Sequence, residues 1–244
     1  MDLLKPPIPS QSRKLRHRGP KSTPVDPNQI LDAAEEIFSQ KGLQAASLRS
    51  IAQRVGCDPA LIYYHFDSKE AMFLALLDRC LPPLAGDLER LGLPSHDAPT
   101  SLRIWEVLQI YRRHLGQHVG LREVVRGQMI RGAEGLQEKL AERIRATSGK
   151  VWNILRQGIE KGELRSDLPV ELVAFFLIKL YLEILDIIPT MAPRVAGIPV
   201  DQALSSAERA WFELYWRGIA ADPLAPLPPL PSTFPEASQN NAHA

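Results

Sequence analysis

Apolar residues recur at helical spacing from residue 30 onward. Five of them follow an i, i+3, i+4, i+7, i+8 pattern that puts them on one helix face: Ile30, Ala33, Ala34, Ile37 and Phe38. Asp26 and Pro27 just before them are typical of an N-cap and a first helical position. Gly42 just after them is typical of a helix end. The pattern predicts a first helix that starts at Pro27 and ends before Gly42.

Two short helices joined by a tight turn are predicted next. Ser47 is a favourable N-cap for residues 48–55, and Asp58 is one for residues 59–66, with Gly56 in the turn between them. Because a longer helix precedes this pair, the three helices have the arrangement of a helix-turn-helix. In such a unit the second short helix enters the DNA major groove and the first braces it against the backbone.

The rest of the chain also reads as helical. Asp67 is expected to cap a fourth helix that starts at Ser68 and runs past Leu77. Runs of alternating β-branched residues are absent, so the predicted fold class is all-α. Further helices are predicted between proline and glycine residues at about 98–118, 121–132, 134–161, 169–189 and 200–218.

Four consecutive aromatic residues, YYHF, end the third predicted helix. Successive helical residues turn by about 100°, so four neighbouring rings cannot share one buried face. Ile62 and Phe66 are four apart and are predicted to face the core. Tyr63, Tyr64 and His65 are then predicted to project outward, where their OH and NH groups can reach phosphates or base edges.

Charge and proline content set the expected domain boundaries. Residues 1–25 carry six basic side chains against one acidic, whereas residues 26–70 carry four against seven. Six of the 21 prolines lie in the first 27 residues and six in the last 22, which disfavours packed structure at both ends. The predicted parts are a flexible basic arm (1–25), a helix-turn-helix domain (26–70), a helical domain (71–220) and a Pro-rich flexible tail (221–244).

Motifs of enzymes and membrane proteins are missing from the chain. It has no phosphate-binding glycine loop, paired-carboxylate motif, HExxH or nucleophile elbow. Cys57 and Cys80 make no disulfide framework and no paired metal motif, as in a cytoplasmic protein. The longest apolar stretch, residues 172–188, is interrupted at i, i+4 and i+7 by Lys179, Glu183 and Asp186. It therefore predicts a packed amphipathic helix rather than a membrane span.

The central helices contain two further groups of polar residues. His114 and His118 have a spacing that suits zinc, but such pairs are more often surface histidines. Five arginines make these helices basic, and they are expected mostly to form a solvated face, with an anionic effector as the alternative: Arg112, Arg113, Arg122, Arg126 and Arg131.

Residues 30–77 resemble the DNA-binding domain of the TetR-type transcriptional repressors. The resemblance is carried by the pattern of the first helix, the run IAQRVG, the run YYHF and the SKE that opens the fourth helix. Residues 158–176 are also similar to the junction between the family's seventh and eighth helices. The resemblance implies a homodimer with an N-terminal DNA-reading domain and a C-terminal helical domain for effector binding and dimerisation.

The resemblance also implies DNA contacts. Tyr63 matches a tyrosine that touches bases and phosphate, while Tyr64, His65 and Lys69 match phosphate contacts and Arg49 matches a position that reaches a guanine. Three apolar residues occupy the base-facing slots, so they can read only thymine methyls and groove shape. The candidate DNA-binding residues are Ser47, Arg49, Pro59, Ala60, Leu61, Tyr63, Tyr64, His65 and Lys69.

The predicted function is a homodimeric, ligand-responsive transcriptional regulator, a repressor of a palindromic operator that a small-molecule effector releases. Its expected partners are double-stranded DNA, that effector and a second copy of the chain, with no catalytic residues, cofactor or metal. Phe175, Leu182 and Trp211 are expected to contribute to the dimer. The alternatives are an α-helical enzyme that docks through the helix-turn-helix and a nucleoid-type DNA binder.

Overall fold

The computed structural model describes residues 25–93, 97–227 and 229–231. The described residues form nine α-helices and one short π-helical segment, and their only β-type pairing is an isolated bridge between Leu164 and Ala220. The all-α fold class is therefore confirmed. The elements are α1 (Pro27–Ala45), α2 (Leu48–Val55), α3 (Pro59–His65), α4 (Lys69–Leu91), α5 (Thr100–Leu115), α6 (Val119–Arg131), α7 (Glu134–Glu160), α8 (Val170–Met191), η1 (Ala192–Ala196) and α9 (Val200–Ile219).

Local capping fixes the starts of the first three helices. The Asp26 side chain accepts a hydrogen bond from Asn28 N at 2.9 Å, and that of Asp58 accepts one from Ala60 N at 2.8 Å. Ser47 and Ser50 cap α2 reciprocally, each side chain bonding the other's backbone N–H. These contacts satisfy donors that a helix N-terminus otherwise leaves unpaired.

The fourth helix starts one residue later than predicted. Ser68, not Asp67, is its N-cap, because Ser68 has the extended backbone and its hydroxyl accepts from Ala71 N at 3.0 Å. At the end of α1, Gly42 has a φ of 73°, which interrupts the regular helix before a last turn to Ala45. A positive φ of this kind favours glycine, as predicted for a helix end.

Two hydrophobic clusters organise the molecule. The N-terminal cluster contains the buried residues of α1–α3 and of the first half of α4, up to Leu77. It also includes Leu121 and Val124 of α6 and Leu136 and Leu140 of α7. The C-terminal cluster begins at Leu84 on α4 and takes in α5, α8, α9 and the second half of α7.

The junction between the clusters lies within α4. Pro82 and Pro83 sit there, inside the helix, and each lacks the N–H that would bond the carbonyl four residues earlier. The domain boundary expected from the sequence, between residues 70 and 71, does not coincide with this junction. It lies in the first turn of α4. That boundary separates Met72 and Phe73, both fully buried, from the N-terminal cluster into which they pack.

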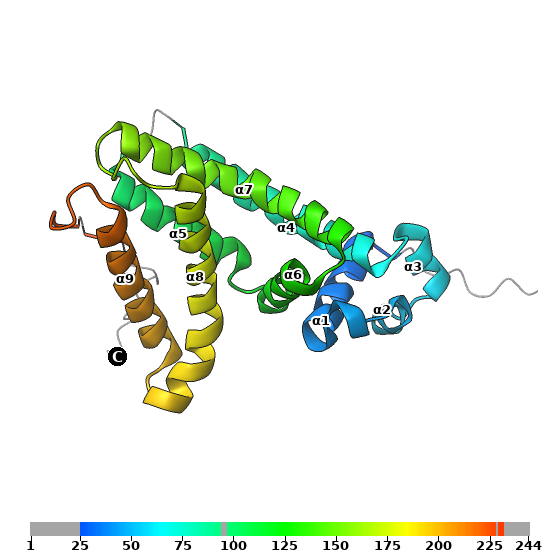
Figure 1. Ribbon diagram of the computed structural model, residues 1–244. Helices are drawn as coiled ribbons and strands as arrows, with labels where there is room; N and C mark the ends of the chain where they lie inside the picture. The colour runs from blue at the N-terminus through cyan, green and yellow to red at the C-terminus, as the bar shows by residue number, and fades with distance from the viewer. Residues whose placement is uncertain (1–24, 94–96, 228, 232–244) are drawn as a thin grey trace, which may run out of the picture.

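The arrangement of the helices is elongated (Figure 1). Helices α1–α3 lie at one end, α4 and α7 run alongside each other toward the middle, and α8 and α9 form a hairpin at the opposite end. Helix α6 packs against α1. Gly120 of α6 comes so near Ser39 of α1 that an added Cβ would lie 1.6 Å from its hydroxyl oxygen. No helix within the described ranges is both long and apolar enough to span a membrane.

The chain after α9 is in contact with the core. Leu227 and Leu230 are partly buried against the C-terminal cluster, and the Arg209 guanidinium donates to the Leu230 carbonyl at 3.4 Å. These contacts differ from the expectation of a flexible tail starting at residue 221, because leucines between the prolines supply apolar anchors. Residues 232–244 of that tail, and residues 1–24 of the basic arm, lie outside the described part of the chain.

Candidate nucleic-acid interface

Helices α2 and α3 are fixed to α1 by buried apolar residues and one ion pair. Ile51 on α2 and Ile62 on α3 are fully buried in the N-terminal cluster. Arg54 on α2 donates to both carboxylate oxygens of Glu36 on α1, at 2.8 and 2.7 Å. The turn between α2 and α3 passes through Gly56, which has a φ of 78°. The short helices are therefore held as one rigid unit with α1.

The aromatic run of α3 divides between inside and outside. Ile62 is buried and Phe66, just after the helix, is half-buried against the N-terminal cluster, as predicted. Tyr63 is 60% exposed and Tyr64 81% exposed, so both phenols project from the surface. His65 is half-buried, and its ring meets that of Tyr64 edge-on at a centroid distance of 5.1 Å.

Most other candidate DNA contacts share this exposed end of the molecule. Pro59 and Ala60 at the start of α3 are exposed, Leu61 is half-buried, and Arg49 on α2 is exposed. In Figure 1 this pair of helices is at the end of the molecule furthest from the α8–α9 hairpin. The folding of α1–α3 thus brings these predicted residues onto one end.

Two of the candidates are already engaged within the protein. The Ser47 hydroxyl accepts from Ser50 N at 3.1 Å as the cap of α2. Lys69 Nζ donates to the carbonyls of Gln44 at 2.7 Å and Ala46 at 3.5 Å. That contact joins the start of α4 to the last turn of α1 and to Ala46 just after it. Lys69 therefore has a positioning role here, whether or not it also meets a phosphate.

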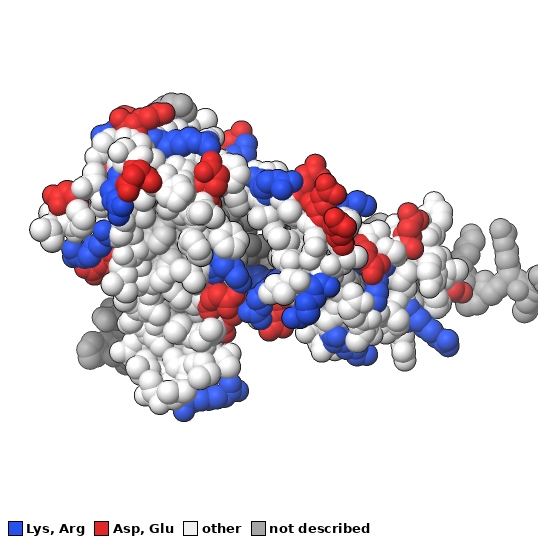
Figure 2. Space-filling view, in the orientation of Figure 1, with Lys and Arg blue, Asp and Glu red and all other residues white. Residues whose placement is uncertain are grey.

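Internal ion pairs offset part of the acidity of residues 26–70. Three carboxylates of α1 face other elements: Glu36 pairs with Arg54, while Asp32 and Glu35 pair with Arg79 of α4 at 2.7 and 3.4 Å. Glu35 also bonds His118 at the start of α6. In Figure 2 basic atoms appear along the lower edge of this end, over α1 and α2. Paired carboxylates repel a polyanion less than the formal count of charges suggests.

This surface has the chemistry of a protein–DNA contact. Phenol hydroxyls and an arginine on the outer side of a two-helix unit supply donors for phosphates and base edges. The apolar residues at the start of α3 supply contacts for thymine methyl groups.

Cys57 in the turn between α2 and α3 is partly buried against the N-terminal cluster. Burial raises the pKa of its thiol, so Cys57 behaves as a small apolar residue rather than as a reactive one.

The possible zinc pair is not brought together by the fold. His114 Nε2 lies 2.8 Å from Asp87 of α4, whereas His118 bonds Glu35 of α1, so the two imidazoles have different carboxylate partners. Across the described residues, no group of three or more His, Cys, Asp or Glu side chains could hold a metal ion.

The expectation that the arginines of the central helices mostly form a solvated face was wrong for Arg112 and Arg122, while Arg113 and Arg131 are exposed. Arg122 of α6 is buried and pairs with Asp186 of α8, and it also donates to the Leu115 and Gly116 carbonyls. Arg126, one turn later, donates to Glu183 at 3.2 Å. Arg112 of α5 pairs at 2.9 Å with Glu208, a fully buried carboxylate of α9.

These pairs were missed because their partners are 57 to 96 residues away along the chain. One signal was present in the sequence. Arg122 and Arg126 are one turn apart on α6, and Glu183 and Asp186 are one turn apart on α8, so two stripes of opposite charge were available to meet. Helix α6 thereby contacts both α1 and the helix α8 of the opposite end.

Comparison with known proteins bears on this geometry. Residues 30–76 match the family described as "Bacterial regulatory proteins, tetR family". The repressor KstR2 of Mycolicibacterium smegmatis is 30% identical over 164 residues, which cover 64% of this chain and 77% of that protein. The repressor NicS of Pseudomonas putida is 26% identical over 155 residues, covering 64% of this chain and 71% of that protein. These relatives are named as transcriptional repressors, not enzymes.

Solved structures share the fold. The regulator FadR from Bacillus subtilis, in complex with stearoyl-CoA, has a TM-score of 0.65 at 21% identity and covers 80% of this chain and all of its own. KstR2 of Mycobacterium tuberculosis has a TM-score of 0.59 at 22% identity and covers 81% of this chain and 96% of its own. The chain therefore belongs to the TetR family of bacterial regulatory proteins and is a DNA-binding transcriptional regulator.

Proposed function

We propose that the protein is a homodimeric repressor that binds a palindromic operator through α2 and α3 and is released by a small-molecule effector. The observation that carries the proposal is the exposed face on which Arg49, Tyr63 and Tyr64 project from a unit anchored by Ile51 and Ile62. The DNA-binding domain in this proposal is residues 26–70 together with the first half of α4, up to Leu77, which packs into the same cluster. The rest of the chain to residue 220 is the domain for effector and dimer.

An exposed apolar strip on α8, η1, the segment after η1 and α9 supports the dimer. Monomeric proteins rarely leave large contiguous apolar areas in water, and such patches mark interfaces. Figure 2 shows the lower part of the α8–α9 hairpin nearly free of charged atoms. The strip consists of Leu172, Phe175, Phe176, Leu180, Ile187, Met191, Val195, Ile198, Val200 and Leu214, each more than a third exposed.

The exposure of individual side chains changes which residues are expected at the dimer interface. Phe175 is 53% exposed and stays a candidate for the interface. Leu182 and Trp211 are half-buried against the C-terminal cluster of their own chain, which limits the surface they can offer to a second copy. Phe176 and Leu214, 50% and 73% exposed, take their place in the proposal.

A dimer gives the effector a physical means of control. Two recognition helices fit paired half-sites only when they are about one DNA turn apart, roughly 34–36 Å, or a multiple of it. An effector that binds more tightly to a conformation with another spacing must weaken operator binding by linkage. Helix α6 is placed to transmit such a change, since it packs on α1 and pairs with α8.

The test combines sedimentation with a footprint. The wild-type protein should sediment as a dimer at micromolar concentration and protect two symmetric half-sites on DNA upstream of its own gene. The double variant Phe176→Glu/Leu214→Glu should become monomeric and lose the symmetric footprint, because two charges per chain are forced into an apolar interface.

The matched control is Ile130→Glu, which changes an exposed apolar residue of α6 outside the strip and should stay dimeric. A wild-type monomer, or a double variant that remains a dimer, would refute the proposed interface. A continuous footprint with no symmetry would instead favour the nucleoid-type binder.

A further inference from the structure

A cavity that is open to solvent lies at the end of the molecule away from α2 and α3. It has a volume of about 640 Å³, within the range of small-molecule sites. Its walls come from the start of α5, the turn after α7, the end of α9 and the segment that follows α9. In Figure 1 that segment, drawn in orange to red, lies beside the start of α5 and the end of α7. Four separate parts of the chain thus build one site.

The lining of this cavity is mostly apolar and has no positive charge. Trp216, which is only 8% exposed, is its largest apolar side chain, and Leu227 lines it from the segment after α9. The ionisable side chains of the lining are two carboxylates, Glu163 and Asp222, and no Lys, Arg or His is among the described residues that line it. The cavity therefore offers an apolar surface and a net negative charge.

Backbone contacts keep the two carboxylates near each other. The isolated bridge between Leu164 and Ala220 joins the turn after α7 to the end of α9. Next to it, Ala221 N donates to the Glu163 carbonyl at 3.0 Å. Asp222 therefore follows directly after the residue that is bonded to Glu163.

Each carboxylate uses one oxygen within the protein. Glu163 Oε2 accepts from Thr100 N at 2.6 Å, and Asp222 Oδ1 accepts from Leu224 N at 2.9 Å. Neither carboxylate makes an ion pair with a described residue. The charge of Glu163 acts on Arg103, but Arg103 is fully buried and does not line the cavity. Even when Arg103 is counted with the lining, the local charge stays negative.

Ser101 adds an unpaired hydroxyl to the same wall. The residue is 2% exposed and lines the cavity from the first turn of α5. Its hydroxyl makes no hydrogen bond with a described residue. Unlike the hydroxyl of Thr100, it is not sealed from solvent. Because Ser101 is otherwise buried, its hydroxyl faces the cavity, where it can accept a hydrogen bond.

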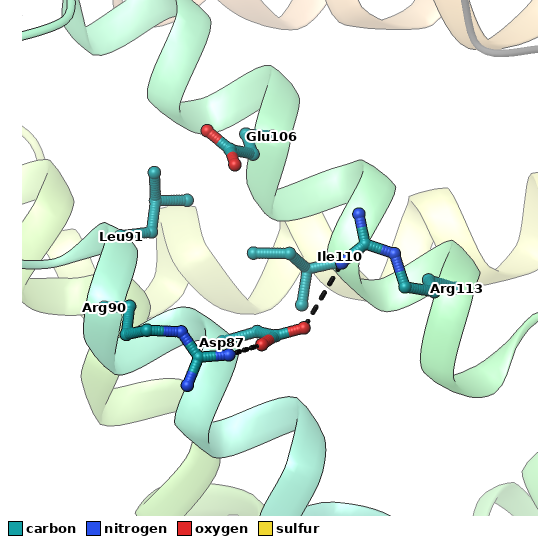
Figure 3. Close-up of a pocket in the computed structure, with 6 residues that line it drawn as sticks. All are labelled: Asp87, Arg90, Leu91, Glu106, Ile110 and Arg113. Carbon is teal, nitrogen blue, oxygen red and sulfur yellow. Dashed lines mark hydrogen bonds and ion pairs between the residues drawn. The ribbon is translucent and has the colours of Figure 1, made fainter.

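A second cavity, between α4 and α5, shows the contrast. It has a volume of about 310 Å³, and Figure 3 shows its carboxylate Asp87 joined by dashed lines to Arg90 and Arg113. Asp87 also bonds His114 at 2.8 Å, and this hydrogen bond and the charges of the arginines lower its pKa. The negative charge of that cavity is therefore compensated from within the protein, whereas that of the larger cavity is not.

We infer that the larger cavity binds a small organic cation with an ammonium head and an apolar body. The head donates to the remaining oxygens of Glu163 and Asp222 and to the Ser101 hydroxyl, since N–H donors and carboxylates form strong, charge-assisted hydrogen bonds. The body lies against Trp216 and Leu227. The N-terminus of α5 does not attract an anion here, because the Glu163 carboxylate already occupies it.

The cavity is placed to affect the proposed dimer. One of its walls belongs to α9, and another is the turn that leads into α8, so both are continuous with the helices of the exposed apolar strip. A cation that binds one arrangement of this turn and α9 more tightly shifts the hairpin toward that arrangement. The inference rests on the proposed function in this respect and gives its effector a chemical class.

Three probes with the same phenylethyl body test the sign of the charge. They are the cation phenethylamine, the neutral phenethyl alcohol and the anion hydrocinnamate. At millimolar concentration and pH 7, the amine should raise the melting temperature of the full-length protein most and hydrocinnamate least. Equal shifts would indicate an unselective apolar cavity, and the largest shift with hydrocinnamate would indicate an anion site. Either result, or no shift with the amine, would overturn the inference.

The double variant Glu163→Gln/Asp222→Asn tests the two carboxylates. It keeps their shape and the oxygens that accept from backbone N–H groups, but it removes both charges. Its affinity for phenethylamine, measured by calorimetry, should fall by about tenfold to a hundredfold, while its affinity for phenethyl alcohol should not change. The matched control is Glu134→Gln/Glu138→Gln, which removes two exposed carboxylates at the opposite end of α7 and should bind both probes as the wild type does.

Phenethyl alcohol separates a lost charge from a lost fold. If the double variant binds neither probe, the single variant Asp222→Asn decides, because this residue is exposed. It should lower the affinity for phenethylamine by about twofold to fivefold, as for an exposed ion pair, and leave that for the alcohol unchanged. An unaltered affinity for the amine, or an equal loss in the control, would contradict the assigned site.

These measurements use no DNA, so they are independent of the repressor proposal. If phenethylamine binds through Glu163 and Asp222 but the protein gives no symmetric footprint, the cation site stands and the proposed repressor fails. If the footprint is symmetric and phenethylamine binding ignores the two carboxylates, the repressor stands and this effector class is wrong.

Discussion

Arg49 and Arg54 lie on the same short helix and have different surroundings. Both are exposed, but Arg54 is committed to Glu36 by two hydrogen bonds, while Arg49 makes no ion pair with any described residue. A side chain without an internal partner can contact a base edge without breaking a hydrogen bond or ion pair within the protein. The two residues therefore form a matched pair for testing specific recognition.

Arg49→Ala is expected to weaken operator binding by about 1–3 kcal/mol if the guanidinium contacts a guanine through two hydrogen bonds. Arg54→Ala should instead reduce the free energy of unfolding by up to about 1 kcal/mol, as for an exposed ion pair, with little change in the preference for operator over random DNA. Titrations on both DNAs measure this. Equal losses for Arg49→Ala on the two DNAs would identify a phosphate contact instead.

Helix α6 approaches α1 closely on one side and forms ion pairs with α8 on the other. Gly120 leaves no room for a side chain against Ser39 of α1, and Arg122 and Arg126 meet Asp186 and Glu183 of α8. Contacts of this type are directional, because an ion pair fixes both the distance and the register of two helices. The α6–α8 pairs therefore set the orientation of α1–α3 relative to the proposed dimer helices.

A double-mutant cycle on the more buried pair tests that role. Arg122→Met alone should cost about 3 kcal/mol in the free energy of unfolding, because Asp186 loses its partner, and Arg122→Met/Asp186→Leu should recover most of it. Both variants should bind the operator more weakly than the wild type, since α6 is no longer held in register. A stable double variant with unchanged operator affinity would mean that the pair contributes stability alone.

At the scale of the whole molecule, the positive charge available for contacting DNA is concentrated near the N-terminus. The chain has a formal net charge of only +1, yet its first 25 residues hold six basic side chains against one acidic. The acids of α1 are largely paired with Arg54, Arg79 and His118. The basic arm is therefore proposed to follow the phosphates or to enter the minor groove outward from α1.

Deleting residues 1–24 should lower the dependence of operator affinity on salt. Each phosphate that is neutralised contributes about 0.9 to the slope of log affinity against log salt, so the slope should flatten by about two to four. Deleting residues 232–244, which contain no Lys or Arg, is the control and should leave the slope unchanged. If the first truncation also keeps the full-length slope, the arm is a solubilising tail.

The sequence by itself determined the helices and the helix-turn-helix, because caps, apolar spacing and glycine stops act within a few residues. Helices α5, α7 and α9 start or end within a few residues of the predicted positions, and the only capping error, Asp67 for Ser68, is a shift by one. The exposure of Tyr63 and Tyr64 was also predicted from the sequence, because successive residues of a helix turn by about 100° and four neighbouring rings cannot share one buried face.

Only the tertiary structure decided which charges meet. Arg112 and Glu208 are 96 residues apart along the chain, and nothing in the local pattern around either residue identifies the other. The same holds for the buried Arg103 of α5, because the hydrogen bonding of its guanidinium depends on where α4 ends and on Glu163 bonding Thr100. A pattern of neighbours fixes which face of a helix is apolar, whereas the partner of a buried charge is fixed only when distant helices pack together.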